Sequence, residues 1–487
     1  MALARARVVF AGLLIASTTA LTGAPAAAAP ASPATTLGPA TTVTLVTGDV
    51  VTLGGPLGAD VAPARGREPA LVVDAPAEYT FDARDGVPLG FTVDRPEARS
   101  ARALIQNTIT TDWGPTGSYR GLPDFDTVRV RPSRTSAPGD VAFLMQAQLA
   151  RPAAGGGFHA SPYLYNLRFT DGARVPADLV RRVTDRQLAR VVSAHAVAAP
   201  GKIGIRERFL PMPLPFTLTE YYTPGTAWRP QFQEAASADE FPPSGVQNIA
   251  NPRSYQLGRT ARERWNVGVF GPSFASDTEI PATLTARLGD EVQFSAGLYT
   301  DQNPDTHGST PDFESADTVI LRDGAVIADY PAVGYIFTEL PPEEATYTVR
   351  TTATRSGPLS TRIDGEWTFR SAHTGGASPT PIPVLAVRFA PNLDDHNTAP
   401  AGRTFRFPVS VQRNGAGRPG RVNTPVVEIS YDDGATWRPV RLVRDHGRWQ
   451  ASVHHPGGAG YASLRWSVSD PAGNQARATV VHAYALR

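Results

Sequence analysis

The sequence predicts an all-β protein made of tandem β-sandwich domains, the last of them immunoglobulin- or fibronectin-like, with one short helix near 184–191. Two observations carry this prediction. Short runs of β-branched and aromatic residues recur along the chain, and Gly-, Asn- and Pro-containing turns separate them. The chain also has 44 Gly and 45 Pro but no Cys. Without disulfides, packed cores must stabilise each domain.

The length of 487 residues suggests about three domains. We expect a β-rich domain over 41–210, a β-sandwich over 216–374 and an immunoglobulin-like sandwich over 385–487. A Pro/Gly linker at 375–384 divides the last two. An extended connector is predicted at the first boundary from three alternate prolines, Pro211, Pro213 and Pro215.

Local patterns predict individual elements. Val43–Thr47 and Val50–Leu53 flank Gly48-Asp49, as in a β-hairpin. Thr184 and Gln187 have the spacing of a capping box and predict the short helix. Alternating apolar residues from Phe405 to Val411 predict a half-buried strand, in which a proline, Pro408, is typical of a sheet edge.

The N-terminus has the pattern of a signal peptide over 1–28. Arg5 and Arg7 precede an apolar run, and Ala26–Ala28 offers a cleavage site before a lead-in at 29–40. The alternative is a membrane anchor, but the run is shorter than the ~20 residues of a span. We therefore expect a secreted, extracellular protein with no membrane contact after cleavage.

Charge and composition exclude several function classes. There are 46 basic and 45 acidic residues, a net charge of +1, with no basic block, which argues against nucleic acid as the main partner. The lack of Cys excludes thiolate zinc sites and a Cys nucleophile.

The segment from Ser430 to Trp437 matches S-x-D-x-G-x-T-W, the Asp-box pattern. We expect a structural turn in which Asp432 accepts turn amides, Gly434 supplies a positive φ and Trp437 packs on the hairpin. A sialidase-type propeller is the functional alternative, but it requires several copies of the motif, and the sequence has one.

Asp301, Asn303 and Asp305 place oxygen ligands at alternate positions, with further acidic residues at Asp312, Glu314 and Asp317. Such a cluster could bind Ca²⁺, although it lacks the glycine position of an EF-hand. A solvated acidic loop without a cofactor is the other interpretation.

Catalytic patterns are incomplete. Gly271–Ala275 lacks the final glycine of a nucleophile elbow, and no H-E-x-x-H is present. His454 and His455 are adjacent, so on a strand they face opposite sides and cannot share a metal. Tyr221 and Tyr222 could stack on sugars or peptides if exposed, or pack in a sandwich core.

A series of segments along the chain points to a known family by its order. The segments are Thr42–Val51, Tyr165–Ala177, Asp185–Val191, Thr219–Tyr222, Leu359–Thr361, Trp367–Ser371, Ser430–Trp437, Tyr461–Leu464 and Asp470–Asn474. They resemble the non-catalytic regions of large secreted actinobacterial subtilisin-like serine peptidases: the first resembles the opening of their propeptides, and the later ones are similar to regions downstream of their catalytic domain. The resemblance is weak between about Gly54 and Thr127.

The chain departs from that family at the catalytic motifs. The family's Asp stands in D-T/S-G, its His in H-G-T and its Ser in G-T-S-M-A, whereas this chain offers only His307-Gly308-Ser309. No catalytic residue can therefore be transferred. We expect a non-catalytic binding or accessory protein whose ligand is an extracellular protein, cell wall or polymer. The alternatives are a peptidase-related hydrolase component with an unrecognised site, or a propeptide-like peptidase inhibitor.

Overall fold

The computed structural model describes residues 41–44, 50–53, 86–111, 114–133, 135, 137–240, 245–275, 284–309, 313–416 and 418–487. The predicted signal peptide and lead-in at 1–40 lie outside these residues. The described residues are almost entirely β, which confirms the predicted fold class. Two strands of the predicted hairpin, β1 (Thr41–Thr44) and β2 (Val50–Leu53), pair antiparallel with Val43 opposite Val51. All other described strands belong to a second compact unit.

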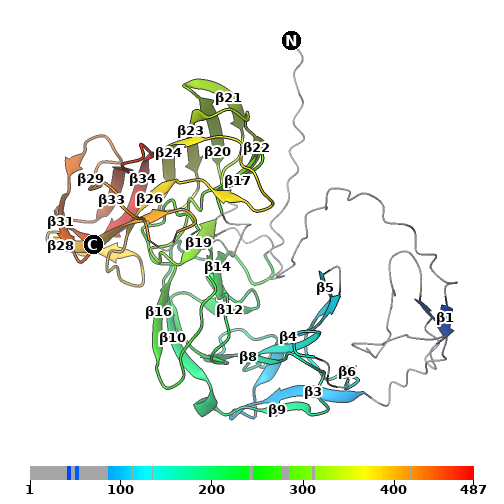
Figure 1. The fold of residues 1–487 in the computed structure, drawn as a ribbon. Coiled ribbons are helices and arrows are strands. Elements are labelled where there is room, and N and C mark those ends of the chain that lie inside the picture. Colours follow the sequence, from blue (N-terminus) through cyan, green and yellow to red (C-terminus); the bar gives the residue numbers. More distant parts are fainter. Residues whose placement is uncertain are drawn as a thin grey trace. The chain divides into compact units, whose positions relative to one another are not determined.

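A seven-stranded sheet forms the centre of the first half of that unit (Figure 1). Its order is β16-β10-β13-β8-β7-β4-β5. The bounds are β4 Arg99–Thr111, β5 Gly114–Leu122, β7 Val141–Ala150, β8 Tyr163–Asp171, β10 Ala189–His195, β13 Phe216–Tyr222 and β16 Ala261–Trp265.

Smaller sheets cover both faces of the seven-stranded sheet, so this half has three layers. One face packs Phe143 and Tyr165 against Leu89 and Leu179 of the sheet β6-β3-β9. On the other face, Leu164 and Leu218 share a buried cluster with Leu210 of the sheet β12-β11-β14-β15-β19. The bounds are β3 Val87–Thr92, β6 Arg129–Val130, β9 Leu179–Arg182, β11 Ile203–Arg206, β12 Leu210–Pro213, β14 Gln231–Ala235, β15 Gln247–Ala250 and β19 Thr306–Ser309.

The boundary expected between 41–210 and 216–374 falls inside these sheets. β13, which follows the proline-rich segment, lies between β10 and β8 and pairs with both. Pro211 and Pro213 belong to β12, an edge strand of the five-stranded sheet. Proline is compatible with an edge because one side of the strand needs no amide donors. The prolines therefore end no domain.

The second half of the unit is a two-layer sandwich. One layer is a nine-stranded sheet with the order β21-β20-β23-β24-β34-β33-β29-β30 and β27 beside β34. Two four-stranded sheets, β22-β18-β17-β25 and β26-β28-β32-β31, share one buried core with it. The bounds are β17 Ala286–Leu288, β18 Glu291–Ser295, β20 Ser315–Arg322, β21 Ala325–Tyr330, β22 Tyr335–Glu339, β23 Ala345–Thr354, β24 Arg362–Ser371, β25 Thr380–Pro381, β26 Leu385–Phe389, β27 Thr398–Ala399, β28 Thr404–Arg413, β29 Val426–Ser430, β30 Arg438–Pro439, β31 Arg441–Asp445, β32 Arg448–His454, β33 Gly460–Ser469 and β34 Gln475–Leu486.

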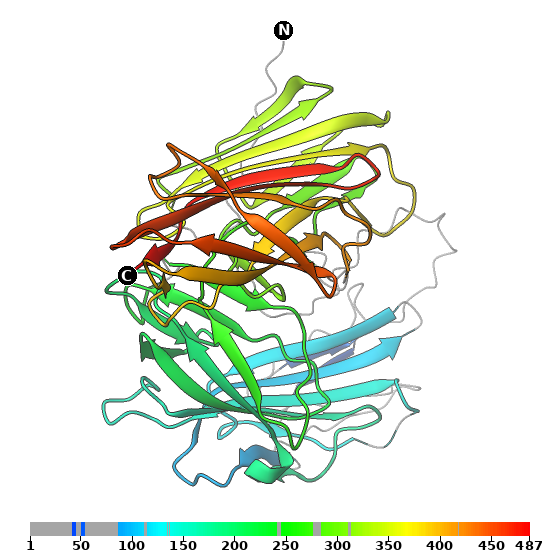
Figure 2. The same ribbon diagram turned by 90° about the vertical axis from the view of Figure 1, so that its left-hand side faces the viewer.

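The segment expected as a linker at 375–384 does not separate two sandwiches. β24, before it, pairs antiparallel with β34 at the C-terminus, from Arg362 opposite Val481 to Thr368 opposite Gln475. Figure 2 shows the red C-terminal strand running beside the yellow strands that precede the linker. Trp367 of β24 donates its indole N–H to the carbonyl of Leu385, 2.9 Å away, in the other layer. The expected domains 216–374 and 385–487 therefore share a sheet and a core.

The alternation predicted around Phe405 is observed, since Phe405, Phe407, Val409 and Val411 are buried in β28. Pro408, however, lies on an inner strand, between β26 and β32. Its carbonyl accepts a hydrogen bond from the amide of Ala390, which directly follows β26, at 3.0 Å. The position at which Pro408 lacks an N–H is therefore at the end of the β26–β28 ladder, so the proline does not interrupt the pairing of these strands.

The predicted helix is a single 3₁₀ turn, η2, over Asp185–Gln187. Its capping box is present, because Gln187 Oε1 accepts the Thr184 amide at 2.8 Å. β10 begins at Ala189 and pairs with β13. The β-branched residues Val191 and Val192 favour that strand, so the helix ends earlier than expected.

Substituting Trp367→Ala should destabilise both parts of the two-layer sandwich together. The side chain is fully buried against Phe274 and Phe294, and loss of a buried Trp costs about 3–5 kcal/mol. Urea unfolding of the full chain, followed by circular dichroism and by limited proteolysis within 245–487, should show one transition of that region at lower urea. Val443→Ala, on an exposed edge, is the control. Two separate transitions, with only the segment before 375 shifted, would contradict the shared core.

Candidate functional site

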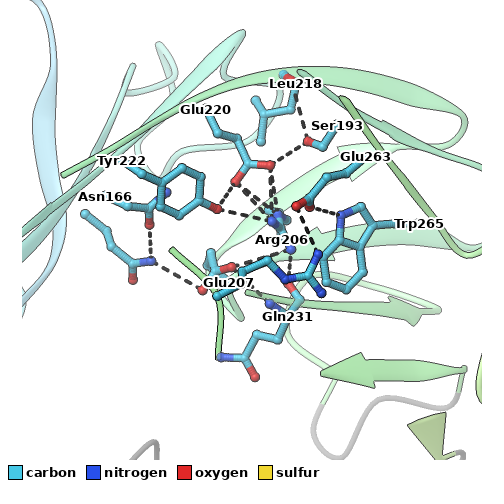
Figure 3. A network of polar contacts seen from close by, with 12 residues as sticks. Asn166, Ser193, Arg206, Glu207, Leu218, Glu220, Tyr222, Gln231, Glu263 and Trp265 are labelled. Atoms are coloured by element: carbon cyan, nitrogen blue, oxygen red, sulfur yellow. Dashed lines mark hydrogen bonds and ion pairs between the residues drawn. The ribbon is translucent and has the colours of Figure 1, made fainter. Parts of the chain in front are cut away.

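A cluster of buried charged side chains lies between the seven-stranded and five-stranded sheets (Figure 3). Arg206 ends β11, and Glu220 faces it from β13. Because side chains alternate along a strand, Glu220 points to the same face as Leu218 and Tyr222. All four side chains are buried, so the sequence places an ion pair where neighbouring strands place apolar residues.

Arg206 is held on three sides. Its Nη2 donates to both carboxylate oxygens of Glu220 at 3.1 Å, and its Nη1 donates to the carbonyl of Gln231 at 2.9 Å. The guanidinium also lies over the ring of Trp265, with Cζ 4.5 Å from the centroid. This arrangement satisfies the cation by charge, hydrogen bonds and an aromatic face.

Glu220 has further donors of its own. The hydroxyl of Ser193 donates to Oε1 at 2.5 Å, and the hydroxyl of Tyr222 donates to Oε2 at 2.7 Å. Burial and the charge of Glu220 hold the pKa of Tyr222 well above its usual range, so the phenol remains a donor at neutral pH. Burial alone would lower the pKa of Arg206, but Glu220 raises it above the ordinary value. Arg206 is therefore a cation in the folded chain.

A strained turn supplies a second carboxylate. Glu207 and Arg208, between β11 and β12, have positive φ angles of 53° and 66°, a conformation that costs roughly 1–2 kcal/mol for a residue with a Cβ. The turn aims Glu207 inward, where its Oε1 lies 3.5 Å from Arg206 Nη1 and accepts the Gln231 amide at 3.0 Å. Burial raises the pKa of Glu207.

His195 of β10 extends this cluster into an aromatic stack. Its ring lies 4.1 Å from that of Phe216 and parallel to it, with Phe232 and Trp265 close by. The ring is buried, and neither nitrogen has a hydrogen-bond partner among the described residues. Burial, with Arg206 nearby, holds the pKa of His195 well below its usual range, so the histidine is neutral in the folded chain.

The geometry assigns a structural role to this network. Its charges are enclosed and committed to partners within the chain, so a ligand would have to displace protein contacts. Arg206 comes from β11 of the five-stranded sheet and Glu207 from the turn that follows it, whereas Ser193, Glu220 and Tyr222 come from the seven-stranded sheet. The ion pair therefore fixes the position of one sheet on the other.

Sequence reasoning missed Arg206 and Glu220 as a pair. The sequence contained one signal. Glu220 lies two residues from both Leu218 and Tyr222, so a charged residue stands at a position of the strand where a core-facing apolar residue is expected. The alternation of side chains along β13 also explains why both tyrosines are buried. Tyr221 and Tyr222 are both buried, on opposite faces, and so pack in cores rather than stacking on an external ligand.

The proposed calcium ligands form a turn. Asp301 is fully buried, and its carboxylate accepts the Asn266 amide at 3.0 Å, the Asn303 amide at 3.1 Å and the Thr306 hydroxyl at 2.7 Å. Asn303 Oδ1 accepts the Asp305 amide at 3.0 Å. Burial raises the pKa of Asp301. Protein donors thus occupy the carboxylate of one of the three candidate calcium ligands.

The Asp-box segment makes the local contacts expected of a structural turn. Asp432 accepts the Thr436 amide at 2.8 Å and the Ser430 hydroxyl at 2.6 Å, and these bonds, from Ser430 and then Thr436, lower its pKa to about 2. Gly434 has φ 93°, and an added Cβ would lie 3.3 Å from the ring of Trp437. The guanidinium of Arg465 also lies over that ring, with Cζ 4.6 Å from the centroid.

The incomplete catalytic motifs lie outside the network of Arg206 and Glu220. Ser273, in the near-match to a nucleophile elbow, is buried and donates to Gln412 at 3.0 Å. His307 is half-buried on β19, and desolvation of its ring lowers its pKa to about 4. His454 is exposed whereas His455 is buried beside Tyr431, so these two histidines face opposite ways, as the strand pattern predicts.

Open sheet edges form a different kind of candidate site. β21 ends the nine-stranded sheet and β22 ends the sheet facing it. The Tyr330 hydroxyl on β21 donates to Thr338 on β22 at 2.9 Å, so the two edges are adjacent. They expose Val326 (63%), Ile327 (42%) and Phe337 (69%). Edge strands with exposed apolar side chains are typical of sites where another chain binds.

The comparisons with known proteins give no family: no family model and no curated protein matches this chain. Within the described ranges, no three or more His, Asp or Glu side chains are grouped so that they could hold a metal ion. No helix in that part of the chain has the length and apolarity needed to cross a membrane.

Substituting Glu220→Gln should cost about 3–5 kcal/mol of unfolding free energy, because it leaves Arg206 buried without its counter-charge. The double variant Arg206→Met, Glu220→Gln should lose less, since the introduced amide can still accept from Ser193 and Tyr222. Urea unfolding measures both. Glu428→Gln, in the half-exposed pair with Arg465, is the control and should cost under about 1 kcal/mol. A double variant less stable than Glu220→Gln would contradict the assigned role.

His195 should make the fold sensitive to acid. Its pKa is lower in the folded than in the unfolded chain, so the unfolded chain binds the proton first, and stability falls as pH drops below about 6.5, by about 1.4 kcal/mol per pH unit. Carboxyl groups with a raised pKa, such as Glu207, make the fold more stable as the pH falls. Their contribution is the same in the natural chain and in each variant, so it cancels in the comparison. His195→Phe should therefore flatten the stability profile between about pH 6.5 and 5, whereas exposed His446→Phe should not. An unchanged slope in His195→Phe would refute the assignment.

Proposed function

We propose that this chain is a secreted, non-catalytic binding protein, related to the regions outside the catalytic domain of subtilisin-like peptidases, and that it holds an extracellular protein partner on the adjacent edges of β21 and β22. The single observation that carries the proposal is the pair of open edges with Val326, Ile327 and Phe337 exposed. The N-terminal signal pattern supports secretion.

The chemistry of these edges favours a protein ligand. An edge strand offers unpaired backbone N–H and C=O groups, which an extended polypeptide can pair with and a polysaccharide cannot match in register. β22 pairs with β18 without a bulge from Glu291 opposite Glu339 to Ser295 opposite Tyr335. Its outer side therefore presents regular backbone groups beside the exposed ring of Phe337.

β21 is less suited to carry a ladder. Its register shifts between Ile320 and Leu321 of β20, which leaves Ile327 as an extra residue. Such a bulge on an edge strand limits pairing with another chain. β22 is thus the strand to which a partner adds, and β21 contributes apolar and charged side chains beside it.

A photo-reactive benzoylphenylalanine at position 337 should cross-link a protein partner when the secreted protein is irradiated in culture medium. The same group at Leu257, which is also exposed but lies outside these edges, is the matched control. Cross-links at neither position, or equally at both, would overturn the binding site. Covalent labelling of a serine by a fluorophosphonate would overturn the non-catalytic part of the proposal.

A further inference from the structure

The two-layer sandwich has two open ends. β21 and β30 are the last strands of the nine-stranded sheet, and β22 and β31 are the last strands of the sheets that face it. β21 and β22 form one end, as the contact of Tyr330 with Thr338 shows. β30 and β31 form the other end, because Val440 alone connects them.

The two ends carry opposite charge. Residues 314–344, which include β21 and β22, contain seven acidic residues against Arg322, a net charge of −6. Arg322 is already paired with Glu343. Residues 438–448, which include β30 and β31, contain four Arg against Asp445, a net of +3. Neither Arg441 nor Arg444 of β31 has an ion-pair partner among the described residues. The whole chain is close to neutral, so the asymmetry is local.

Like charges already crowd the acidic end. Asp317 and Asp329 lie on neighbouring strands, and burial together with the charge of Asp329 raises the pKa of Asp317. A cationic partner would relieve this repulsion. The basic end carries its own exposed apolar residue, Val443 (51%). Each end therefore presents what the other lacks.

We propose that the partner held by the acidic end is the basic end of a second copy of this chain, with β22 of one copy pairing antiparallel with β31 of the next. This inference rests on the proposed function and names its partner. Both strands have five residues, Tyr335–Glu339 and Arg441–Asp445. Paired end to end, Phe337 lies opposite Val443 and Glu339 lies opposite Arg441.

This register matches exposed side chains at Phe337 and Glu339, whereas buried Ile336 lies opposite exposed Arg444. Phe337 and Glu339 face outward on β22, and Val443 and Arg441 are exposed on β31. Leu442, which packs on the shared core, then lies opposite Thr338, the residue of β22 that Tyr330 contacts from the facing sheet. Parallel pairing would instead place Glu339 opposite Asp445, and like charges directly opposite destabilise a sheet. Charge therefore selects the antiparallel arrangement.

The contact joins two different surfaces. Each copy keeps one unoccupied end, so the association is head-to-tail and can extend beyond a dimer. The two-layer sandwich of one copy would continue into that of the next. Only a few cross-strand pairs contribute, so the association depends on protein concentration and weakens with salt.

Cysteine cross-linking tests the register directly, because the natural chain has no Cys. Mixing the full-length Phe337→Cys and Val443→Cys variants under mild oxidation should give disulfide-linked dimers, since directly opposite strand residues have the Cα separation that a disulfide needs. Each variant alone should form no disulfide-linked dimer, because its cysteine then lies opposite a native side chain. The matched control is a mixture of Tyr119→Cys and Leu257→Cys, two exposed positions away from the ends. No excess over this control, or dimers from Phe337→Cys alone, would overturn the proposal.

Charge reversal gives an independent test with a built-in rescue. In sedimentation velocity at low salt, Glu339→Arg alone and Arg441→Glu alone should each weaken self-association about tenfold or more. An equimolar mixture should restore it, because each reversed end meets its complement. Asp178→Arg, an exposed acidic site elsewhere, should have no effect. Failure of the mixture to assemble would overturn the pairing.

These results separate the two proposals. A photo-cross-link from position 337 to a different protein, with no disulfide between the Phe337→Cys and Val443→Cys variants, would leave the binding site standing and remove self-association. Loss of both would remove the binding site as well.

Discussion

The pairing of β24 with β34 is the interaction on which the second half of the molecule depends. Seven residue pairs join the strand before the expected linker to the C-terminal strand. They turn two groups of strands into one nine-stranded sheet, and Trp367 ties that sheet to the layer opposite. A core this large can be stable without disulfides, because the buried fraction of the apolar surface rises with size.

Buried polar side chains fix how the layers sit. Arg206 and Glu220 lock one pair of sheets, and Asn397 joins the two halves of the unit. Asn397 Oδ1 accepts the Gly268 amide at 2.7 Å, and its amide nitrogen donates to the carbonyls of Val197 at 2.9 Å and Asn266 at 3.1 Å. Apolar contacts are not directional, whereas a buried hydrogen-bond donor left without its acceptor costs about 1–3 kcal/mol of folding free energy. Such contacts therefore select one arrangement among many that bury similar area.

Local patterns in the sequence were enough to predict the fold class and several turns, because alternation and turn chemistry depend on neighbouring residues. Phe405 to Val411 and Ser430 to Trp437 are of this kind. The joining of distant strands was not predictable in this way: β24 contains no signal that its neighbour is β34, far along the chain. The edge strand predicted from Pro408 and the domain boundary predicted from Pro211 failed for a related reason. Whether a proline fits into a strand depends on which neighbouring strand pairs with it, and the local sequence does not show this. The sequence also left two interpretations of Asp301 open, a calcium ligand or part of a solvated loop, because it does not show that the fold surrounds this carboxylate with donors from distant segments such as Asn266.

Hydrogen exchange tests the shared sheet most directly. If β24 and β34 are neighbours in one cooperative sheet, the amides of Ile363–Thr368 and Gln475–Val481 should exchange with the same free energy of opening, equal to that of global unfolding. Mass spectrometry of peptides from the intact protein under native conditions measures this. Exchange of the β34 amides through a lower-energy opening, while those of β24 stay protected, would contradict the account, because it would show that the C-terminal segment unfolds on its own.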